Sequence, residues 1–123
     1  MFCGTRTATD FVTNYLQRAG IEAQAIHGGL KQQSRMNVLE GFHKGKIHTL
    51  VATDVAARGL DIKNVSHIFN FDVPKTPEEY THRIGRTARI GKEGVAITLI
   101  TRNDHEIFRK IVEWNKGIEK YKL

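Results

Sequence analysis

The sequence predicts an α/β fold in which a parallel sheet of about five strands lies between helices on both faces, as a three-layer sandwich. Short apolar segments of strand length alternate along the chain with longer segments of helical periodicity. The connections between these segments are only a few residues long, which is typical of strand–helix–strand units. The 123 residues are enough for one domain with a continuous core.

The first unit is expected to be a buried strand at Phe2 and Cys3, a turn over residues 4–6 and an amphipathic helix. Thr7 is the expected N-cap, because the carboxylate of Asp10 follows three residues later in a capping box. Gly20 is expected to end this helix. The apolar residues of its expected inward face are Ala8, Phe11, Val12, Tyr15, Leu16 and Ala19.

The second unit combines a short apolar strand over residues 23–26 with a helix over about residues 31–43, which Gly45 closes. A third strand is expected over residues 48–52. The side chains expected to face inward from the helix are Met36, Leu39 and Phe42.

The third unit has a strand over residues 65–71, rich in β-branched and aromatic side chains, and the clearest helix start in the chain. Thr76 is the expected N-cap, Pro77 occupies the first helical position and Glu79 completes a capping box.

A fifth strand is expected over residues 94–100 and a last helix over residues 103–114. The basic tail, residues 115–123, is too weakly patterned to assign. The side chains expected to face inward from the last helix are Ile107, Phe108, Ile111 and Val112.

The composition bounds the possible functions. The 19 basic and 13 acidic residues give a net charge of +6 and a pI near 9.7, which favours a polyanionic partner. With Cys3 as the single cysteine and no paired histidine spacing, neither a disulfide nor a metal site is expected. No apolar run reaches the roughly 18 residues that span a bilayer, and no signal peptide is recognisable, so a cytoplasmic location and no membrane partner are expected.

Polar and glycine-bearing turns follow the strands at residues 4–6, 27–29, 53–61 and 72–74. In parallel α/β sheets, functional residues gather beyond the carboxyl ends of the strands. We therefore expect the first three of these turns to lie along one edge of the sheet.

The segment over residues 82–89 places Arg83, Arg86 and Arg89 at steps of three residues. Guanidinium groups bind phosphate oxygens bidentately, so converging arginines suit a transferring phosphoryl group, whereas a solvated basic turn is the alternative. No phosphate-binding P-loop accompanies them. The nearest match, residues 85–92, has five residues between its glycines and is followed by Glu93 in place of the metal-binding hydroxyl.

Three blocks together carry a family resemblance: T-D-V-A-A-R-G-L-D at residues 53–61, H-R-I-G-R-T-A-R at residues 82–89, and His27-Gly28 with Gln32 and Arg35. They resemble the second RecA-like domain of DEAD-box RNA helicases over nearly the whole chain. The resemblance implies a RecA-like helicase C-terminal domain over residues 1–123, whose N-terminal edge is truncated inside the motif IV strand.

The resemblance also implies roles on the nucleotide side. Arg86 and Arg89 would be arginine fingers for the γ-phosphate of ATP, Asp61 would contact the ribose and Gly59 would let the backbone approach the nucleotide. Phe2 would pack under the arginine turn. The residues implied in coupling to the other domain are Arg58, His82 and Arg83.

On the RNA side, the resemblance implies sequence-independent contacts with the sugar-phosphate backbone of single-stranded or duplex RNA. The residues implied are Thr5, Gly28, Gln32, Arg35 and Thr53. Structural alternatives stay open for residues on both sides: Thr53 and Asp54 can cap a turn, Gln32 and Arg35 can form a solvated helix face, Gly28-Gly29 can be a tight turn, and Phe2 can be core.

The family keeps ATP and Mg²⁺ mainly on an N-terminal RecA-like domain, which is absent from this chain and is its expected partner. The resemblance therefore implies half of an ATP-dependent RNA helicase, monomeric and inactive in isolation. Two alternatives stay open: a non-catalytic RNA-binding or regulatory module, and a DNA translocase of the same superfamily.

Overall fold

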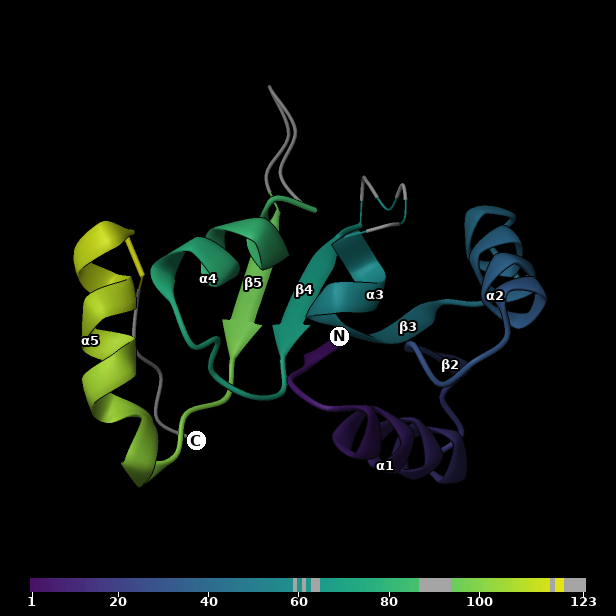
Figure 1. Ribbon diagram of the computed structural model, residues 1–123, viewed down its shortest axis with the longest axis horizontal. Coiled ribbons are helices and arrows are strands. Elements are labelled where there is room, and N and C mark those ends of the chain that lie inside the picture. The colour runs from purple at the N-terminus through teal and green to yellow at the C-terminus, as the bar shows by residue number, and fades with distance from the viewer. Residues whose placement is uncertain (59, 61, 63–64, 87–93, 116, 119–123) are drawn as a thin grey trace.

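The sheet is parallel throughout and has five strands in the order β2-β3-β1-β4-β5 (Figure 1). The computed structural model describes residues 1–58, 60, 62, 65–86, 94–115 and 117–118. The predicted α/β fold with a parallel sheet of five strands is confirmed. The strands are β1 (Phe2–Cys3), β2 (Ala23–Ile26), β3 (Thr49–Thr53), β4 (His67–Asn70) and β5 (Val95–Thr98).

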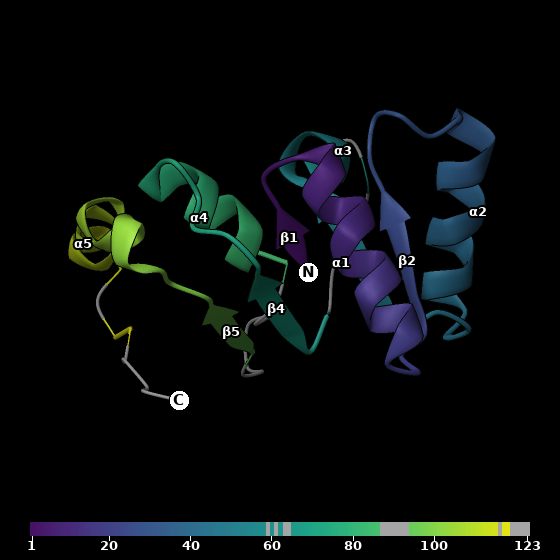
Figure 2. The same ribbon diagram turned by 90° about the horizontal axis from the view of Figure 1, so that it is seen from below.

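Helices cover both faces of this sheet. Apolar side chains of α1 pack with Cys3, Ala23 and Val51 on one face, and those of α2 and α3 pack with Phe2 and Ile68 on the other. Figures 1 and 2 show α2 beside β2 and α5 beyond β5, at opposite ends of the molecule, and α5 packs against α4. The helices are α1 (Arg6–Arg18), α2 (Gln32–His43), α3 (Asp54–Arg58), α4 (Pro77–Ile84), η1 (Arg102–Asp104) and α5 (His105–Trp114).

Helix α1 begins two residues earlier than expected, because its N-cap is Thr5 and not Thr7. The Thr5 hydroxyl accepts a hydrogen bond from the Ala8 amide at 3.1 Å. The predicted capping box fails because the Asp10 carboxylate turns instead to the His27 imidazole, at 2.9 Å. Gly20 follows the helix with a φ of 84°, as predicted for a residue that ends it.

The buried face of α1 also differs from the expected one. Phe11 and Tyr15 are 64% and 67% exposed, so their predicted inward orientation is wrong. The buried positions are Thr9, Val12 and Thr13. The two threonines can be buried because their hydroxyls donate to backbone carbonyls four residues earlier, at 2.8 and 2.7 Å. Ala19, predicted inward as well, is exposed.

In α2 and α5, the inward faces differ from the predicted ones. In α2, Val38, Leu39 and Phe42 pack against the core, whereas Met36 is 47% exposed. In α5, Phe108 and Ile111 are buried and Val112 packs against them, whereas Ile107 is 37% exposed. Val38 therefore takes the place predicted for Met36 in α2, and α5 is anchored by one apolar side chain fewer than predicted.

Helix α4 starts as predicted, with Pro77 at its first position and the Thr76 hydroxyl accepting from the Glu79 amide at 3.1 Å. The capping box is displaced by one residue, since the Glu79 carboxylate accepts from the Lys75 amide at 3.3 Å and not from Thr76. The start of α4 is thus fixed on both sides of its N-cap.

Candidate functional site

The turns after β2, β3 and β1 lie side by side at the carboxyl edge of the sheet, because these three strands are neighbours and parallel. The predicted common edge is confirmed. It brings together Gly28 after β2, Thr53 at the end of β3 and Thr5 after β1. We call this row the carboxyl edge.

Two hydroxyls on the carboxyl edge already serve the backbone. Thr5 caps α1, and the buried Thr53 hydroxyl accepts from the Ala56 amide at 3.3 Å. A hydroxyl that accepts one hydrogen bond keeps its own proton for donation. The capping role expected as a structural alternative is therefore present, and it leaves each hydroxyl able to donate to a phosphate oxygen.

Gln32 is the first residue of α2 and Arg35 the fourth, so the two side chains lie on the same face of the helix. The Gln32 side-chain oxygen accepts from Arg35 Nη2 at 2.5 Å, which holds the guanidinium toward the start of the helix. Arg35 Nε is buried and has no hydrogen-bond partner among the described residues. The two predicted RNA-binding side chains thus act as one unit.

Arg6, which sequence reasoning missed, lies directly over the predicted RNA-binding residue Gly28. A Cβ built on Gly28 would stand only 2.6 Å from Arg6 Nη2. Arg6 is exposed and forms no ion pair with any residue that the structure describes. Its position next to Thr5 in the sequence was the only available signal, and that signal did not reveal its contact with a different strand's turn.

Arg83, on α4, is a buried hub. Its guanidinium is 2% exposed and makes five hydrogen bonds, matching its five N–H donors. The Asp54 carboxylate accepts two of them, at 2.7 and 2.8 Å, in a bidentate pair. Asp72 accepts through its backbone carbonyl at 2.8 Å and its carboxylate at 3.1 Å, and Asn70 accepts at 3.4 Å.

The hub also touches β1. The Arg83 guanidinium lies over the Phe2 ring, 5.5 Å from its centroid, so the prediction that Phe2 packs under the arginine turn is confirmed, and Phe2 is at the same time a core residue. The second Asp72 carboxylate oxygen accepts from the Gly4 amide at 2.5 Å. Arg83 is therefore linked to both sides of the carboxyl edge, to Thr53 through Asp54 and to Thr5 through Asp72 and Gly4.

The electrostatics of the hub favour a permanent charge. Burial by itself lowers the pKa of the Arg83 guanidinium, but the hydrogen bonds and charges of Asp54 and Asp72 outweigh it and raise the pKa overall. Nearby, burial and then the Asp72 charge raise the pKa of the Cys3 thiol to about 11. The Arg83 guanidinium is thus held as a cation between the Asp54 and Asp72 carboxylates in a mostly buried site.

Arg58 and His82 flank this hub on the surface. Arg58, at the end of α3, stands 3.9 Å from the Glu79 carboxylate of α4, in a partly exposed ion pair. His82 is exposed on α4. Both side chains are available to a second protein surface, unlike Arg83.

Arg86 lies just beyond the end of α4, next to a segment that was expected to contact nucleotide. Its guanidinium donates to the carbonyls of Ala57, Leu60 and Ile62 at 3.3, 3.4 and 3.4 Å. Gly59 and Asp61, the predicted nucleotide contacts, belong to the same segment but lie outside the described residues, as does Arg89. Arg83 and Arg86 therefore engage separate partners and do not converge.

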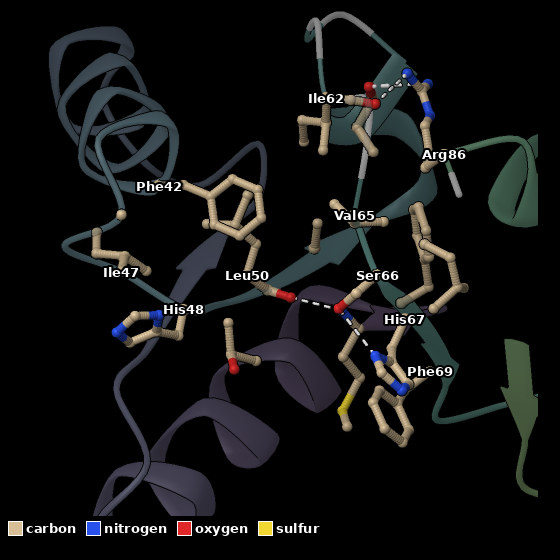
Figure 3. A pocket seen from close by; sticks show the side chains of 17 residues that line it. Phe42, Ile47, His48, Leu50, Ile62, Val65, Ser66, His67, Phe69 and Arg86 are labelled. Carbon is tan, nitrogen blue, oxygen red and sulfur yellow. Dashed lines mark hydrogen bonds between the residues drawn. The ribbon is translucent and has the colours of Figure 1, made fainter. Parts of the chain in front are cut away.

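A cavity of about 550 Å³ adjoins Arg86 (Figure 3). It lies at the amino-terminal ends of β3 and β4, and Phe42, Leu50 and Ile68 contribute to its largely apolar lining. Figure 3 shows the Arg86 guanidinium next to Ile62, with its hydrogen bonds to the backbone drawn as dashed lines. The sequence pattern gave no indication of this cavity.

Two further properties concern the described part of the chain. No group of three or more metal-ligating side chains is found there. No described helix is long and apolar enough to span a membrane.

Comparisons with known proteins agree with this geometry. A family described as the helicase conserved C-terminal domain matches residues 1–91. The chain is 50% identical over 116 residues to the DEAD-box ATP-dependent RNA helicase CshA of Bacillus licheniformis. The aligned region covers 94% of this chain and 24% of that relative. The chain thus spans about a quarter of the length of that curated relative.

Solved structures give the same result. The E. coli DEAD-box protein SrmB, bound to regulator of ribonuclease activity A, superposes with a TM-score of 0.87 at 42% identity, covering 94% of this chain and 68% of that one. S. cerevisiae Dbp5 bound to RNA and ADP BeF3 superposes with a TM-score of 0.85 at 35% identity, covering 96% of this chain and 32% of that one. The chain belongs to the helicase conserved C-terminal domain family and is a RecA-like domain of the DEAD-box type.

Proposed function

We propose that this chain is the C-terminal half of an ATP-dependent RNA helicase. It supplies Arg86 and Arg89 to an ATP site completed by an N-terminal RecA-like domain, and its carboxyl edge forms part of the RNA-binding surface. The relative CshA is described as an ATP-dependent RNA helicase, and the Dbp5 structure contains RNA and ADP BeF3. These descriptions support the assignment of both ligands.

The observation that carries the proposal is the position of Arg86 against residues 57–62. The predicted arginine finger contacts the carbonyls of the same segment that holds the predicted nucleotide contacts Gly59 and Asp61. The three hydrogen bonds are 3.3 to 3.4 Å long and therefore weak. Arg86 can exchange them for phosphate oxygens at small cost.

Arginine suits this role because its charge is permanent and its planar fork matches a phosphoryl group. A finger of this kind contributes roughly 10³ to 10⁵ in rate by stabilising charge on the transferring group. ATP with Mg²⁺ supplies the reactive phosphate when bound. The described residues fit the phosphate through Arg86 but offer no carboxylate cluster for the metal, which we assign to the N-terminal domain.

The side chains of the carboxyl edge are of the types that bind the sugar-phosphate backbone of a nucleic acid. Its hydroxyls at Thr5 and Thr53 and the side chains of Gln32 and Arg35 can contact phosphate and sugar, which position a strand without reading bases. Binding should be independent of sequence and should weaken with salt, because phosphate neutralisation releases counterions.

Arg83 offers a physical route between the two ligands. It joins α4, which leads to Arg86, to Asp54 next to Thr53 and to Asp72, which binds the Gly4 amide. We propose that Arg83 couples the RNA edge to the arginine turn inside this domain, and that the exposed Arg58 and His82 make the contacts with the N-terminal domain.

The proposal is tested with a hybrid enzyme in which this chain replaces the matching segment of B. licheniformis CshA. We expect RNA-stimulated ATP hydrolysis from the hybrid and none from the isolated 123-residue chain. Turnover by the isolated chain well above a protein-free blank would contradict the claim that it is half a site. A folded hybrid that binds RNA but hydrolyses no ATP would favour the non-catalytic RNA-binding module.

Single-stranded RNA and DNA of the same sequence, compared as activators of the hybrid, separate the helicase from a DNA translocase. Contacts with the 2′-hydroxyl favour RNA. Equal activation by both polymers would support the translocase.

A further inference from the structure

We propose that His27 is a positioning residue that holds the Gly28-Gly29 turn in the conformation in which its backbone and the Arg6 side chain together meet an RNA phosphate. This inference rests on the proposed RNA-binding function of the carboxyl edge. It assigns roles to His27, Asp10 and Arg6, none of which was among the predicted binding residues.

His27 directly follows β2 and is buried, with 6% of its surface exposed. Its Nδ1 accepts a hydrogen bond from the Gly29 amide at 3.0 Å. Its Nε2 faces the Asp10 carboxylate of α1 at 2.9 Å. Since Nδ1 accepts, the ring proton is on Nε2 and is donated to Asp10, so the imidazole is neutral and both nitrogens are used.

The two hydrogen bonds of His27 connect the Gly28-Gly29 turn to α1. The contact with Asp10 anchors the imidazole to α1, and the contact with Gly29 carries that anchor into the backbone of the turn. A Cβ on Gly29 would lie 2.9 Å from His27 Cε1, so the imidazole packs directly against the turn that it orients. Neither Gly28 nor Gly29 has a positive φ, so the two glycines serve the close approach of the Arg6 and His27 side chains and not a left-handed backbone.

The charge of the turn comes from Arg6. Its guanidinium lies against Gly28, where a Cβ would approach Nη2 to 2.6 Å, and it pairs with no carboxylate among the described residues. Asp10, the one carboxylate of α1, is engaged by His27. An exposed guanidinium over an exposed glycine backbone matches the size and charge of a phosphodiester group.

Two substitutions separate the two contacts of His27. His27→Asn keeps an acceptor near the position of Nδ1, which can take the Gly29 amide as in an Asx turn, but it loses the reach to Asp10. His27→Gln keeps a donor that reaches Asp10 but removes the acceptor for Gly29. The two variants are therefore matched controls for each other.

The experiment titrates the 123-residue chain and both variants with a uridine decamer and follows Gly28 and Gly29 amide signals by NMR. Amide hydrogen exchange of Gly29 and the melting temperature are measured without RNA. We expect His27→Gln to lose Gly29 protection and to bind the decamer about fivefold more weakly, the effect of one hydrogen bond. His27→Asn keeps the acceptor for the Gly29 amide and loses only the anchor on Asp10, so it should lose less Gly29 protection and less affinity than His27→Gln.

Arg6→Gln provides the third arm. It should weaken binding and lower the slope of log affinity against log salt by about 0.7, the effect of one phosphate contact on a single strand, with Gly29 exchange unchanged. An unchanged salt slope would overturn the assignment of Arg6 to a phosphate.

The outcomes distinguish this inference from the function on which it rests. Absence of decamer binding by the wild-type chain would contradict the RNA-binding function itself. If the wild type binds, equal affinities of wild type and His27→Gln would overturn the positioning role. A loss of affinity that follows the melting temperature in both variants alike would assign His27 to stability alone.

Discussion

Arg83 and Arg86 stand three residues apart, yet their surroundings are opposite. Arg83 is 2% exposed, satisfies all five donors and sits between two carboxylates from other elements. Arg86 is half-buried and holds three backbone carbonyls through long hydrogen bonds. Equal spacing in the motif therefore does not mean equal roles.

The difference follows from where α4 ends. Arg83 lies in the last turn of the helix, on the side that faces the sheet, where Asp54 and Asp72 follow the carboxyl ends of β3 and β4, the strands on either side of β1. Arg86 lies after the C-cap Gly85 and donates to backbone carbonyls instead. The first arginine fixes the helix to the sheet, and the second extends from the fixed end.

The largest expected effect on stability is that of Arg83→Met. It leaves Asp54 and Asp72 without their cation, and breaking a buried pair from one side costs about 3 to 5 kcal/mol of unfolding free energy. Urea unfolding of the isolated chain measures this loss. The double variant Arg83→Met/Asp54→Leu should recover part of the lost unfolding free energy, because an apolar pair leaves no unpaired charge at this position. If nothing is recovered, the ion pair between Arg83 and Asp54 does not carry the stability assigned to it.

Cys3 reports on the same cluster. The thiol is fully buried, and burial with the Asp72 charge raises its pKa to about 11, so little thiolate forms at pH 8 in the folded chain. We expect slow reaction of Cys3 with a thiol reagent in the wild type and a rate at least about tenfold higher in Arg83→Met, whose local opening is less costly. An unchanged rate would show that the cluster does not hold β1 in place.

A smaller effect is expected at the opposite end of α4. Thr76→Ala removes the N-cap hydroxyl that accepts from Glu79 and should cost about 1 kcal/mol of unfolding free energy. Thr76→Ser serves as the control that keeps the acceptor. A cost as large as that of Arg83→Met would show that the cap and not the hub fixes α4.

The smallest effect on stability is expected for Arg86→Ala. Its three hydrogen bonds are long and its site is partly solvated, so the unfolding free energy should change by no more than about 0.5 kcal/mol. The midpoint of urea unfolding checks this value. A loss comparable with that of Arg83 would make Arg86 a structural residue and remove the contrast between the two.

Much of the fold follows from local patterns. The alternation of strand-like and helix-like segments, the Thr76-Pro77 start of α4 and the glycine after α1 are each determined by a few neighbouring residues. The prediction of the buried face of α1 was wrong. Thr9 and Thr13 are buried because their hydroxyls donate to backbone carbonyls, and Phe11 and Tyr15 are exposed instead. Apolar periodicity does not account for such internal hydrogen bonds.

The site was predicted less completely, because its contacts join distant segments. The partners of Arg83 come from positions 54, 70 and 72, and the contact between Arg6 and Gly28 joins two different turns. Motif resemblance identified Arg83, Gly28 and the packing of Phe2, but not the polar side chains that position Arg83 and Gly28. Those depend on strand order, which the sequence pattern does not provide.

The central claim is that Arg86 acts on the chemistry while Arg83 holds the scaffold. The most direct measurement is the RNA-stimulated kcat of the CshA hybrid with Arg86→Ala, together with its RNA affinity and its unfolding midpoint, and with Arg109→Ala on the exposed face of α5 as the control. We predict a fall in kcat of about 10³-fold or more with RNA affinity within about twofold and the midpoint unchanged. A kcat within about tenfold of the unmodified hybrid would contradict the account.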